Sequence, residues 1–539
     1  MPTYNVPGVW VEELSLLPPS VAQVATAVPA FIGYTEKGSG VARITSLLEY
    51  ESQFGKANPS AYSVTVAGDG SVSLTRSDAS TNRFLMYYAL TLFFRNGGGP
   101  CYIVSTGNYS ATPAKAAFVT GLGQLEQLDE PTLIVLVDAI NLSKTDYYDL
   151  AQQALAQCGK LADRFAILDV PREDNKSLRD DATSFRNGVG TNYLSYGAAY
   201  HPFLLTSLNY QYLESGVKVP GPLQWSSGTN GFLVSRTGSG PARVKVAANA
   251  DATVTTFDFD TTTESGTLSI VFPANGLSKD AVTAWNASSK AKSGFSVVQV
   301  GDGSAGVKAA SADLAVAQLP LSSLKTTNTG LYNKVKTALA NDPASQVVLP
   351  PSSAIAGIYA RVDAERGVWK APANVSVSSV IGPVSNVSND DQASLNVDPD
   401  SGKSINAIRS FTGKGTLVWG SRTLLGNDNE WRYVPVRRLF IMIEESTRKA
   451  SAFAVFEPND ANTWLKVKAM IGSYLFGLWE QGALAGSKPE QAYFVNVGLG
   501  KTMTAQDILE GRMIVEIGIA AVRPAEFIIL RFSHKMQEA

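Results

Sequence analysis

WRYVPVRRLFIMIEESTRKASAFAVFEPND (431–460) and GRMIVEIGIAAVRPAEFIILRF (511–532) begin and end the stretch that decides the fold of this chain. The pattern of the whole stretch predicts an apolar strand, two amphipathic helices and further strands, with few breaks. The terminal run would place apolar side chains on both faces of a strand: Phe527, Ile528, Ile529, Leu530 and Phe532. Such a strand needs cover on both faces. We therefore expect either an internal strand or a hook that binds another subunit.

The overall composition indicates a globular chain of several domains. A length of 539 residues is enough for roughly two to four domains, each with its own core. Apolar residues make up 45% and charged residues 17%, which is typical of folded proteins. The net charge of -2 favours neither nucleic acid nor an anionic membrane as a partner. No apolar run reaches the roughly 18 residues of a membrane-spanning helix, and the start lacks the pattern of a signal peptide. We therefore expect synthesis and assembly in the cytoplasm.

The N-terminal segment is a second extended, partly apolar end. Recurring prolines exclude a helix through most of residues 1–30. A short strand is predicted at Val9-Trp10-Val11, between Gly8 and the acidic pair Glu12-Glu13. About 14 extended residues reach roughly 45 Å, enough to cross to a neighbouring molecule. Two apolar ends suggest that subunits exchange terminal segments by strand addition.

From Ala30 the pattern predicts an α/β body. A helix is expected over 81–96, ending at three glycines, and Ser143 with Asp146 is expected to cap another helix. The inner stripe of that second helix would be Leu150, Ala154, Leu155 and Cys158. Buried strands are expected at 101–106, 131–139, 164–170 and 195–206. The body is therefore a set of β-α-β units with right-handed connections.

Residues 215–320 differ in composition, being rich in Ser, Thr, Gly, Ala and Asp. Alternating segments at 253–260, 267–272 and 295–300 predict small strands, so we interpret this stretch as an inserted β-rich domain. The body resumes with a helix that starts at Ser352 or Ser353 and ends at Gly367. In that helix Asp363 and Arg366 have the spacing of an ion pair. A polar loop over 384–411 then leads to a strand over 415–425.

No catalytic or metal site is evident in the sequence. The two histidines, His201 and His534, are far apart, and nothing near either resembles the frame of a nucleophile. The two cysteines, Cys101 and Cys158, are too few for a zinc site or a disulfide framework. We therefore expect no enzymatic activity, no cofactor and no metal.

Two short glycine-lysine segments suggest a nucleotide-binding loop at first sight. Gly500-Lys501-Thr502 and Gly402-Lys403-Ser404 look like the end of a phosphate-binding loop, but that loop needs a further glycine five positions earlier, where this chain has Val495 and Val397. Both matches fail, and we predict that the first is the loop after a strand over 491–497. A nucleotide-driven enzyme is therefore the weakest hypothesis for the function of this chain, behind the two structural roles considered below. Absence of ATP binding would exclude it.

Several motifs in the chain resemble those of one protein family, the tail sheath proteins of contractile bacteriophages and of phage-tail-like contractile injection systems. The motifs keep the order of the family along the chain except across 215–320: PGVWVEE, RNGGGPCYIV, LDVP, VPPSSAIAGIYARVDAERGVWKAPAN, INAIRSF, TLVWGSRTL, YVPVRRLFIMIEES, FEPND, LWEQGALAG and RPAEFIILRF. The N-terminal PPSVAQVATAVPAFIGYTEKG is more similar to the injection-system branch. Tyr200-His201-Pro202-Phe203 departs from the aromatic-Pro-Trp motif common in the family.

The resemblance, together with the patterns above, predicts an α/β and α+β multidomain chain. An α/β body carries an inserted β-rich domain, an α+β C-terminal domain and extended N- and C-terminal arms. The expected ranges are an N-terminal arm (1–30), the body (31–214 plus 321–405), the insertion facing outward (215–320), the C-terminal domain facing an inner tube (406–523) and a C-terminal arm (524–539).

The resemblance also implies which residues meet other subunits. The intersubunit arms would use Val6, Val9, Trp10, Val11, Glu12, Glu13, Phe527, Ile528, Ile529, Leu530 and Phe532. Family-motif residues expected at interfaces are Arg361, Asp363, Glu365, Arg366, Trp369, Arg422, Arg437 and Arg438. On the helix after Asn462, Lys466 and Lys468 are candidates for the face toward the tube, with an ordinary solvated face as the alternative.

The function implied by the resemblance is that of a non-enzymatic structural subunit. Hexameric rings of this chain would stack into a helical sheath around an inner tube protein, with baseplate and terminal cap proteins as further partners and with neither nucleic acid nor membrane insertion. Contraction would drive the tube through a target envelope. The particle would be assembled in the bacterial cytoplasm and then be a released or anchored phage-tail-like particle, or a virion tail. The alternative is a static filament or baseplate component that uses the same arms.

Overall fold

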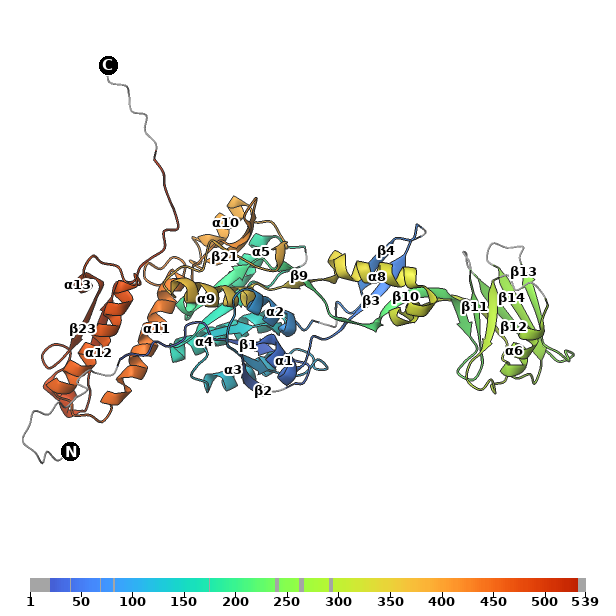
Figure 1. Cartoon of the computed structure of the whole chain (residues 1–539), viewed down its shortest axis with the longest axis horizontal. Coiled ribbons are helices and arrows are strands. Elements are labelled where there is room, and N and C mark those ends of the chain that lie inside the picture. Colours follow the sequence, from blue (N-terminus) through green and yellow to red (C-terminus); the bar gives the residue numbers. More distant parts are fainter. Residues whose placement is uncertain are drawn as a thin grey trace, which may run out of the picture. The chain divides into compact units, whose positions relative to one another are not determined.

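The computed structural model describes residues 20–531 except 39, 68, 81–82, 174, 238–241, 261–265 and 290–293. The N-terminal arm residues Val6 to Glu13, and also Phe532 and His534, lie outside the described residues. The chain forms two compact units, shown in Figure 1. The first unit consists of Met1–Asn58, Arg83–Leu208 and Gln346–Ala539, and the second of Pro59–Asn82 and Asn209–Ser345.

A nine-stranded sheet forms the centre of the first unit. Its order is β19-β22-β21-β8-β7-β6-β1-β5-β2, and the strands from β21 to β5 are parallel to one another. β2 at one edge and β22 and β19 at the other run antiparallel to their neighbours. The strands are β1 (Pro29–Gly33), β2 (Gly40–Ile44), β5 (Cys101–Ser105), β6 (Leu133–Leu136), β7 (Phe165–Asp169), β8 (Gly197–His201), β19 (Val375–Ser376), β21 (Ile405–Phe411) and β22 (Gly415–Val418).

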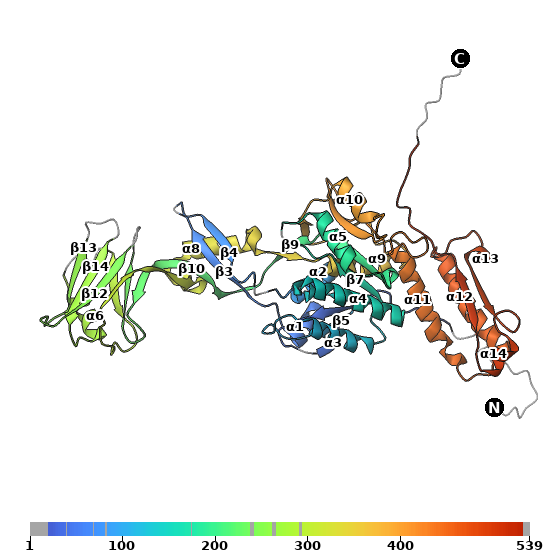
Figure 2. The same ribbon diagram turned by 180° about the vertical axis from the view of Figure 1, so that it is seen from behind.

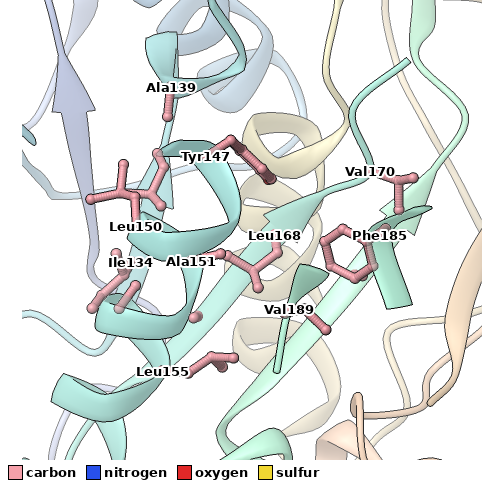
Figure 3. Close-up of a cluster of buried hydrophobic side chains, with 14 of the residues drawn as sticks. Ile134, Ala139, Tyr147, Leu150, Ala151, Leu155, Leu168, Val170, Phe185 and Val189 are labelled. Carbon is pink, nitrogen blue, oxygen red and sulfur yellow. The ribbon is translucent and has the colours of Figure 1, made fainter. Parts of the chain in front are cut away.

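Helices cover this sheet and close its core. They are α1 (Leu47–Phe54), α2 (Met86–Arg95), α3 (Lys115–Glu126), α4 (Lys144–Leu161), α5 (Leu178–Gly188), α9 (Ser352–Arg366) and α10 (Asn389–Asn396). Figure 3 shows the core in which Leu150 and Leu155 of α4 pack with Ile134 and Leu168 of the sheet. The predicted cap is confirmed, because the hydroxyl of Ser143 accepts a hydrogen bond from the backbone N–H of Asp146.

Helices α2 and α9 pack directly against each other. Their close approach depends on Gly357, since a Cβ at this position would lie 2.5 Å from the carbonyl oxygen of Phe93. Gly97, at φ 99°, follows the end of α2, and Gly367, at φ 85°, is the C-cap of α9. Both are positions at which a glycine avoids backbone strain.

One predicted loop in the first unit is instead part of the central sheet. The segment Ile405–Phe411 was expected within a polar loop, but it forms β21, which pairs in parallel with β8. Its burial explains the difference, because four consecutive residues are covered on both faces. The expected boundary at 405/406 therefore falls inside a strand. Within 415–425 the strand is also shorter than expected, since β22 ends at Val418.

The C-terminal part of the first unit is a small α+β domain. Its helices are α11 (Val434–Ala450), α12 (Ala461–Glu480), α13 (Pro489–Ala492) and α14 (Ala505–Leu509), and its strands are β23 (Tyr493–Val497) and β24 (Val515–Ile519). α11 and α12 are the two predicted amphipathic helices, but the described residues 431–433 directly before α11 form no strand. Leu439, Ile443, Val467, Ile471 and Leu475 form the centre of the core between them.

A three-stranded sheet in the first unit has the order β18-β9-β20. Its strands are β9 (Leu204–Asn209), β18 (Gln346–Leu349) and β20 (Val380–Pro383).

The second unit contains two sheets and is larger than the insertion expected at 215–320. It also includes 59–82 and 321–345, because β3 pairs in parallel with β10 and α8 packs against β4. The strands of the larger sheet are β3 (Ser60–Val66), β4 (Val72–Arg76), β10 (Tyr212–Ser226), β11 (Phe232–Arg236), β15 (Phe295–Gln299) and β17 (Ala315–Pro320). Those of the smaller sheet are β12 (Arg243–Asn249), β13 (Thr256–Asp260), β14 (Thr267–Pro273) and β16 (Ala310–Asp313). The helices are α6 (Ser278–Ala287), α7 (Leu324–Thr327) and α8 (Thr329–Asn341).

Candidate assembly interface

The described part of the C-terminal segment carries exposed apolar side chains. Figures 1 and 2 show it extending away from the helices of the C-terminal domain. Phe527, Ile528, Ile529 and Leu530 are each 70–80% exposed and have no regular secondary structure. The alternative of an internally docked strand is therefore wrong for these residues. Four adjacent large apolar side chains in water are costly for an isolated chain, which indicates a surface that another molecule covers.

The root of this segment is held by a partly buried ion pair between Glu526 and Arg422. The guanidinium of Arg422 donates three hydrogen bonds to the Glu526 carboxylate, at 2.6–3.1 Å. Asn396 and Tyr433 donate two more. The Arg422 side chain is 4% exposed and that of Glu526 is 21% exposed. Burial raises the pKa of Glu526, but these hydrogen bonds and the charge of Arg422 outweigh it, so the pKa is lowered overall. The segment is thus fixed at Glu526 and uncovered after it.

Strands β23 and β24 form a two-stranded antiparallel sheet with register Val495↔Ile517. Among the residues that the structure describes, neither strand pairs with a third, so each has one edge of unpaired N–H and C=O groups. Phe494 on β23 is half-exposed. Such edges are sites at which an extended segment can add as a further strand.

The N-terminal segment is fastened to the same domain by another ion pair, which is buried. Arg438 on α11 donates two hydrogen bonds to the Asp363 carboxylate on α9, at 3.0 and 2.5 Å. The Thr26 hydroxyl donates to the same carboxylate, and the Thr26 carbonyl accepts a hydrogen bond from Arg438. The side chains of Arg438 and Asp363 are 3% and 7% exposed. A further hydrogen bond runs from the backbone N–H of Val24 to the Ser446 hydroxyl on α11.

The expected pairing of Asp363 with Arg366 is wrong, because Asp363 pairs with Arg438 across two helices. Arg366 is exposed, as is Glu365. A guanidinium N–H of Arg361 donates to the carbonyl of Ser376. Of the arginines expected at interfaces, Arg422 and Arg438 therefore bind within their own chain.

Arg437 is also buried, between two aromatic rings. Its guanidinium carbon lies 4.2 Å from the ring centre of Tyr196 and 4.4 Å from that of Trp431. It also donates to the Tyr196 hydroxyl and to Glu444. The remaining predicted residues lie at the surface or at the edge of the core: Trp369 packs against the core of the C-terminal domain, while Lys466 and Lys468 are exposed on α12.

His201 and the two glycine-lysine loops are the described residues that were weighed for catalysis or nucleotide binding. His201 is buried, and burial lowers its pKa to about 4, so its imidazole is neutral at pH 7. The loop Gly500-Lys501-Thr502 follows β23, as predicted, and the Thr502 hydroxyl donates to the carbonyl of Ile514. The described ranges contain no group of three or more His, Cys, Asp and Glu side chains placed to hold a metal ion. Within them no helix is long and apolar enough to cross a membrane.

The residues that fix the two terminal segments were not predicted from sequence. Thr26, Asn396, Ser446 and the anchoring role of Glu526 were not predicted, because each contact joins residues that lie 104 or more positions apart. The sequence carried a partial signal for one of these contacts, at Glu526. Glu526 is the only charged residue in 524–530, directly before the apolar run, and such a residue needs a partner if it is buried.

Comparison with known proteins relates the chain to sheath proteins. The family model of the phage tail sheath C-terminal domain matches residues 426–535. The tail sheath protein of Burkholderia phage BcepMu is 32% identical over 144 residues, which is 26% of this chain and 30% of that protein. The tail sheath protein of Enterobacteria phage T4 is 26% identical over 129 residues, which is 24% of this chain and 19% of that protein. The aligned part thus spans less than a third of each of these curated relatives.

Two solved structures match along nearly the whole chain. One is the PVC sheath complex of an extracellular contractile injection system in the contracted state, with 27% identity, coverage of 99% of both chains and a TM-score of 0.57. The other is the helical sheath of the anti-feeding prophage (AFP) in the contracted state, with 28% identity, coverage of 99% of this chain and 100% of that chain, and a TM-score of 0.56.

Proposed function

Because this chain belongs to the contractile tail sheath family, we propose that it is a structural subunit of a contractile sheath. Copies of it form hexameric rings that stack around an inner tube, and contraction of the stack drives the tube through a target envelope. The observation that carries the proposal is the match along 99% of both chains with a sheath subunit of an injection system in its contracted state. The role is structural and non-enzymatic.

The terminal arms join neighbouring copies. In an assembled sheath the exposed run Phe527–Leu530 adds to an edge of the β23–β24 sheet of another copy, where its backbone groups pair and its apolar side chains are covered. The Arg422–Glu526 ion pair supports this function, since it holds the start of the arm on its own subunit. The N-terminal arm residues Val6 to Glu13 are exchanged in the same way.

Arms of this kind suit a lattice that changes its geometry. Each unit has its own buried core and moves as a nearly rigid body, while the strand-paired arms keep neighbours connected. The C-terminal domain faces the tube, with Lys466 and Lys468 as candidate contacts, and the second unit faces outward. Baseplate and cap proteins close the two ends. Subunits assemble in the bacterial cytoplasm and become part of a phage-tail-like particle or virion tail.

The arm is tested with one substitution and a matched control. Ile529→Asp places a charge in the arm, whereas Leu48→Asp does the same at an equally exposed apolar side chain on α1, both being 77% exposed. If Ile529 is buried on assembly, its loss and the buried charge cost at least about 3 kcal/mol, so polymerisation should need a subunit concentration about 100-fold higher. Sedimentation measures this concentration. Unchanged polymerisation of the Ile529→Asp chain would refute the arm contact.

A further inference from the structure

One aromatic side chain stands out from the surface of the C-terminal domain. Phe456 lies in the loop between α11 and α12 and is fully exposed. Its φ is 67°, in the left-handed region that few residues other than glycine adopt. The preceding Val455 is 62% exposed. A large apolar side chain that is strained as well as uncovered indicates a contact with another molecule.

The loop that carries Phe456 is fixed by hydrogen bonds to the rest of the domain. The Asn459 side chain donates to the carbonyl of Arg512 at 3.0 Å and accepts a hydrogen bond from the indole N–H of Trp464 at 2.7 Å. The Asp460 carboxylate caps α12, since it accepts hydrogen bonds from two backbone N–H groups at the start of that helix. The backbone of the loop is therefore held in place, and binding a partner costs little conformational entropy.

A carboxylate accompanies the exposed ring. Glu457 directly follows Phe456, is exposed, and forms no ion pair with any residue that the structure describes. We refer to Phe456 and Glu457 together as the knob. A surface that receives the knob should combine apolar walls for the ring with positive charge for the carboxylate.

A groove of about 700 Å³ lies beside the root of the C-terminal arm. Its walls come from the segment after α9 (369–374), the loop after β22 (419–421) and the start of the arm (522–526 and 528), with Tyr433 and Gly482 between them. All of these residues belong to the first unit, so the groove is complete within one compact body.

The walls of the groove are aromatic. Trp369, Trp419 and Tyr433 line it. The ring of Trp419 is fixed by contact with Phe411, at 4.6 Å between ring centres. Aromatic walls of this kind suit another aromatic side chain, because rings pack well edge to face or offset.

Positive charge lies beside these rings. The lining contains one carboxylate, that of Glu526, which Arg422 already pairs, and three cationic side chains: Arg366, Lys370 and Arg523. Arg366 and Arg523 are exposed and form no ion pair with any described residue. Three cations with no carboxylate left free favour an occupant that brings a negative charge.

The knob and the groove lie at opposite ends of α11. Tyr433, in the wall of the groove, directly precedes this helix, and the knob follows its other end (Figure 1). The helix has 17 residues and is therefore about 25 Å long. A knob fixed this far from the groove of its own chain can reach only the groove of another copy. Such a head-to-tail contact can repeat from copy to copy along a ring or a helical strand.

We propose that the knob of one copy binds the groove of a second copy, with Phe456 against the aromatic walls and Glu457 facing Arg366 and Arg523. The inference rests on the proposed sheath function and adds a direct contact between the folded parts of two C-terminal domains, besides the exchanged arms. The contact covers the ring of Phe456, which explains why a strained and exposed aromatic residue stands at this position.

Substitution of Phe456 tests the apolar half of the contact. Phe456→Asn removes the ring but supplies a residue that tolerates the left-handed backbone, so the melting temperature of the dilute chain should not fall. The subunit concentration needed for polymerisation, measured by sedimentation, should rise at least about 10-fold. Phe456→Tyr keeps the ring and should stay within about 3-fold of the unmodified chain. As a matched control, Leu48→Asn changes an exposed apolar side chain on α1 and should have no effect.

Charge reversal tests the polar half. Glu457→Lys should raise the concentration needed for polymerisation at least about 10-fold, since it would place a like charge against the cations of the groove. Adding Arg366→Glu and Arg523→Glu to the same chain should bring the concentration back to within about 3-fold of the unmodified chain. As a matched control, adding Lys176→Glu and Lys488→Glu reverses two exposed cations elsewhere on the first unit and should not restore polymerisation.

Disulfide trapping gives a second, direct readout. Chains with Glu457→Cys are mixed with chains with Arg366→Cys, so a crosslink between the two can form only between different copies. The native Cys101 and Cys158 are buried, and burial raises the pKa of each thiol, which keeps the background low. A disulfide-linked dimer should form with Arg366→Cys and not with the control Lys488→Cys.

The outcomes separate this proposal from the proposed function. If the unmodified chain polymerises and the Phe456→Asn chain polymerises equally well, or if the groove substitutions do not restore the Glu457→Lys chain, the groove assignment is wrong and the sheath function stands. If Phe456→Asn impairs only assembly around the inner tube, the knob faces the tube, which also overturns the contact between copies. If the unmodified chain never polymerises, the proposed function fails and this contact fails with it.

Discussion

Replacing Asp363 by Asn tests whether one buried ion pair holds the N-terminal segment, α9 and α11 together. Asn has the shape of Asp without its charge, so Arg438 loses the carboxylate that accepts two of its hydrogen bonds. Water cannot replace this partner, because both side chains are almost fully buried. Removing one member of a buried ion pair costs about 3–5 kcal/mol. The amide oxygen still accepts one hydrogen bond and the Tyr359 ring still contacts the guanidinium, so we expect a loss of about 3 kcal/mol.

The assay is urea unfolding of the dilute, unpolymerised chain, followed by tryptophan fluorescence. Three variants calibrate the result. Thr26→Val removes the hydroxyl that donates to Asp363 and should cost about 1 kcal/mol. Glu365→Gln changes an exposed carboxylate on the same helix and should change stability by less than about 0.5 kcal/mol. In a double-mutant cycle with Arg438→Gln, the two losses should couple by about 2 kcal/mol, because either one already breaks the pair.

Hydrogen exchange locates the effect. In the Asp363→Asn chain the backbone N–H groups of residues 24–28 should exchange faster than in the unmodified chain, since Thr26 loses the carboxylate that accepts its hydroxyl hydrogen bond. A change in unfolding free energy below about 1 kcal/mol, or a coupling energy near zero, would refute the reasoning that this pair fastens the N-terminal segment.

Three further predictions concern pH, the arm root and a backbone position. Burial raises the pKa of Asp169 to about 7 although Ser352 donates to it twice, so its stabilising contribution is fully present below about pH 4 and is lost as the pH rises through 7. Asp169→Asn should remove up to about 3 kcal/mol of the change in unfolding free energy between pH 5 and pH 8, measured by comparing the two chains at both pH values. Glu526→Gln should lower the unfolding free energy by about 2 kcal/mol at pH 7, which is less than the loss expected for a fully buried ion pair. The difference in unfolding free energy from the unmodified chain should shrink as acid protonates Glu526. Equal stability of the two chains at pH 7 would contradict the role of Arg422. Gly97→Ala should cost about 1–3 kcal/mol in a thermal melt, because φ is 99° and the added Cβ would lie 2.7 Å from the Cβ of Arg361, whereas Gly99→Ala, which meets nothing within 4 Å, should be neutral.

The elements of the body that could be predicted are those set by local pattern. The buried strands β5, β6 and β7, the cap at Ser143 and the end of α9 at Gly367 follow from residue type and spacing within a few positions. β21 was missed because its neighbours in sequence are polar and its burial comes from pairing with β8, about 200 positions earlier. The placement of 59–82 in the second unit was missed for the same reason, since the partner of β3 is β10.

The candidate site was predicted in part. For the apolar C-terminal run the sequence left an internal strand and a hook for another subunit as alternatives, because both would cover its two apolar faces. The exposure of Phe527–Leu530 decides between them. The arginines could not be placed, since an arginine in a motif is equally compatible with a surface contact and with a buried internal pair. Arg422 and Arg438 are both buried in the single chain, where they bind Glu526 and Asp363. Their spacing in sequence carries no information about those distant partners.

The central claim is that this chain builds a sheath with two states. The most direct measurement is negative-stain electron microscopy of the purified chain, polymerised alone and polymerised with its inner tube protein. The account predicts wide, hollow tubes from the chain alone and longer, narrower tubes around the inner tube, with conversion of the second form to the first on triggering. Tubes of a single diameter under every condition would contradict contraction and would leave a static filament that uses the same arms.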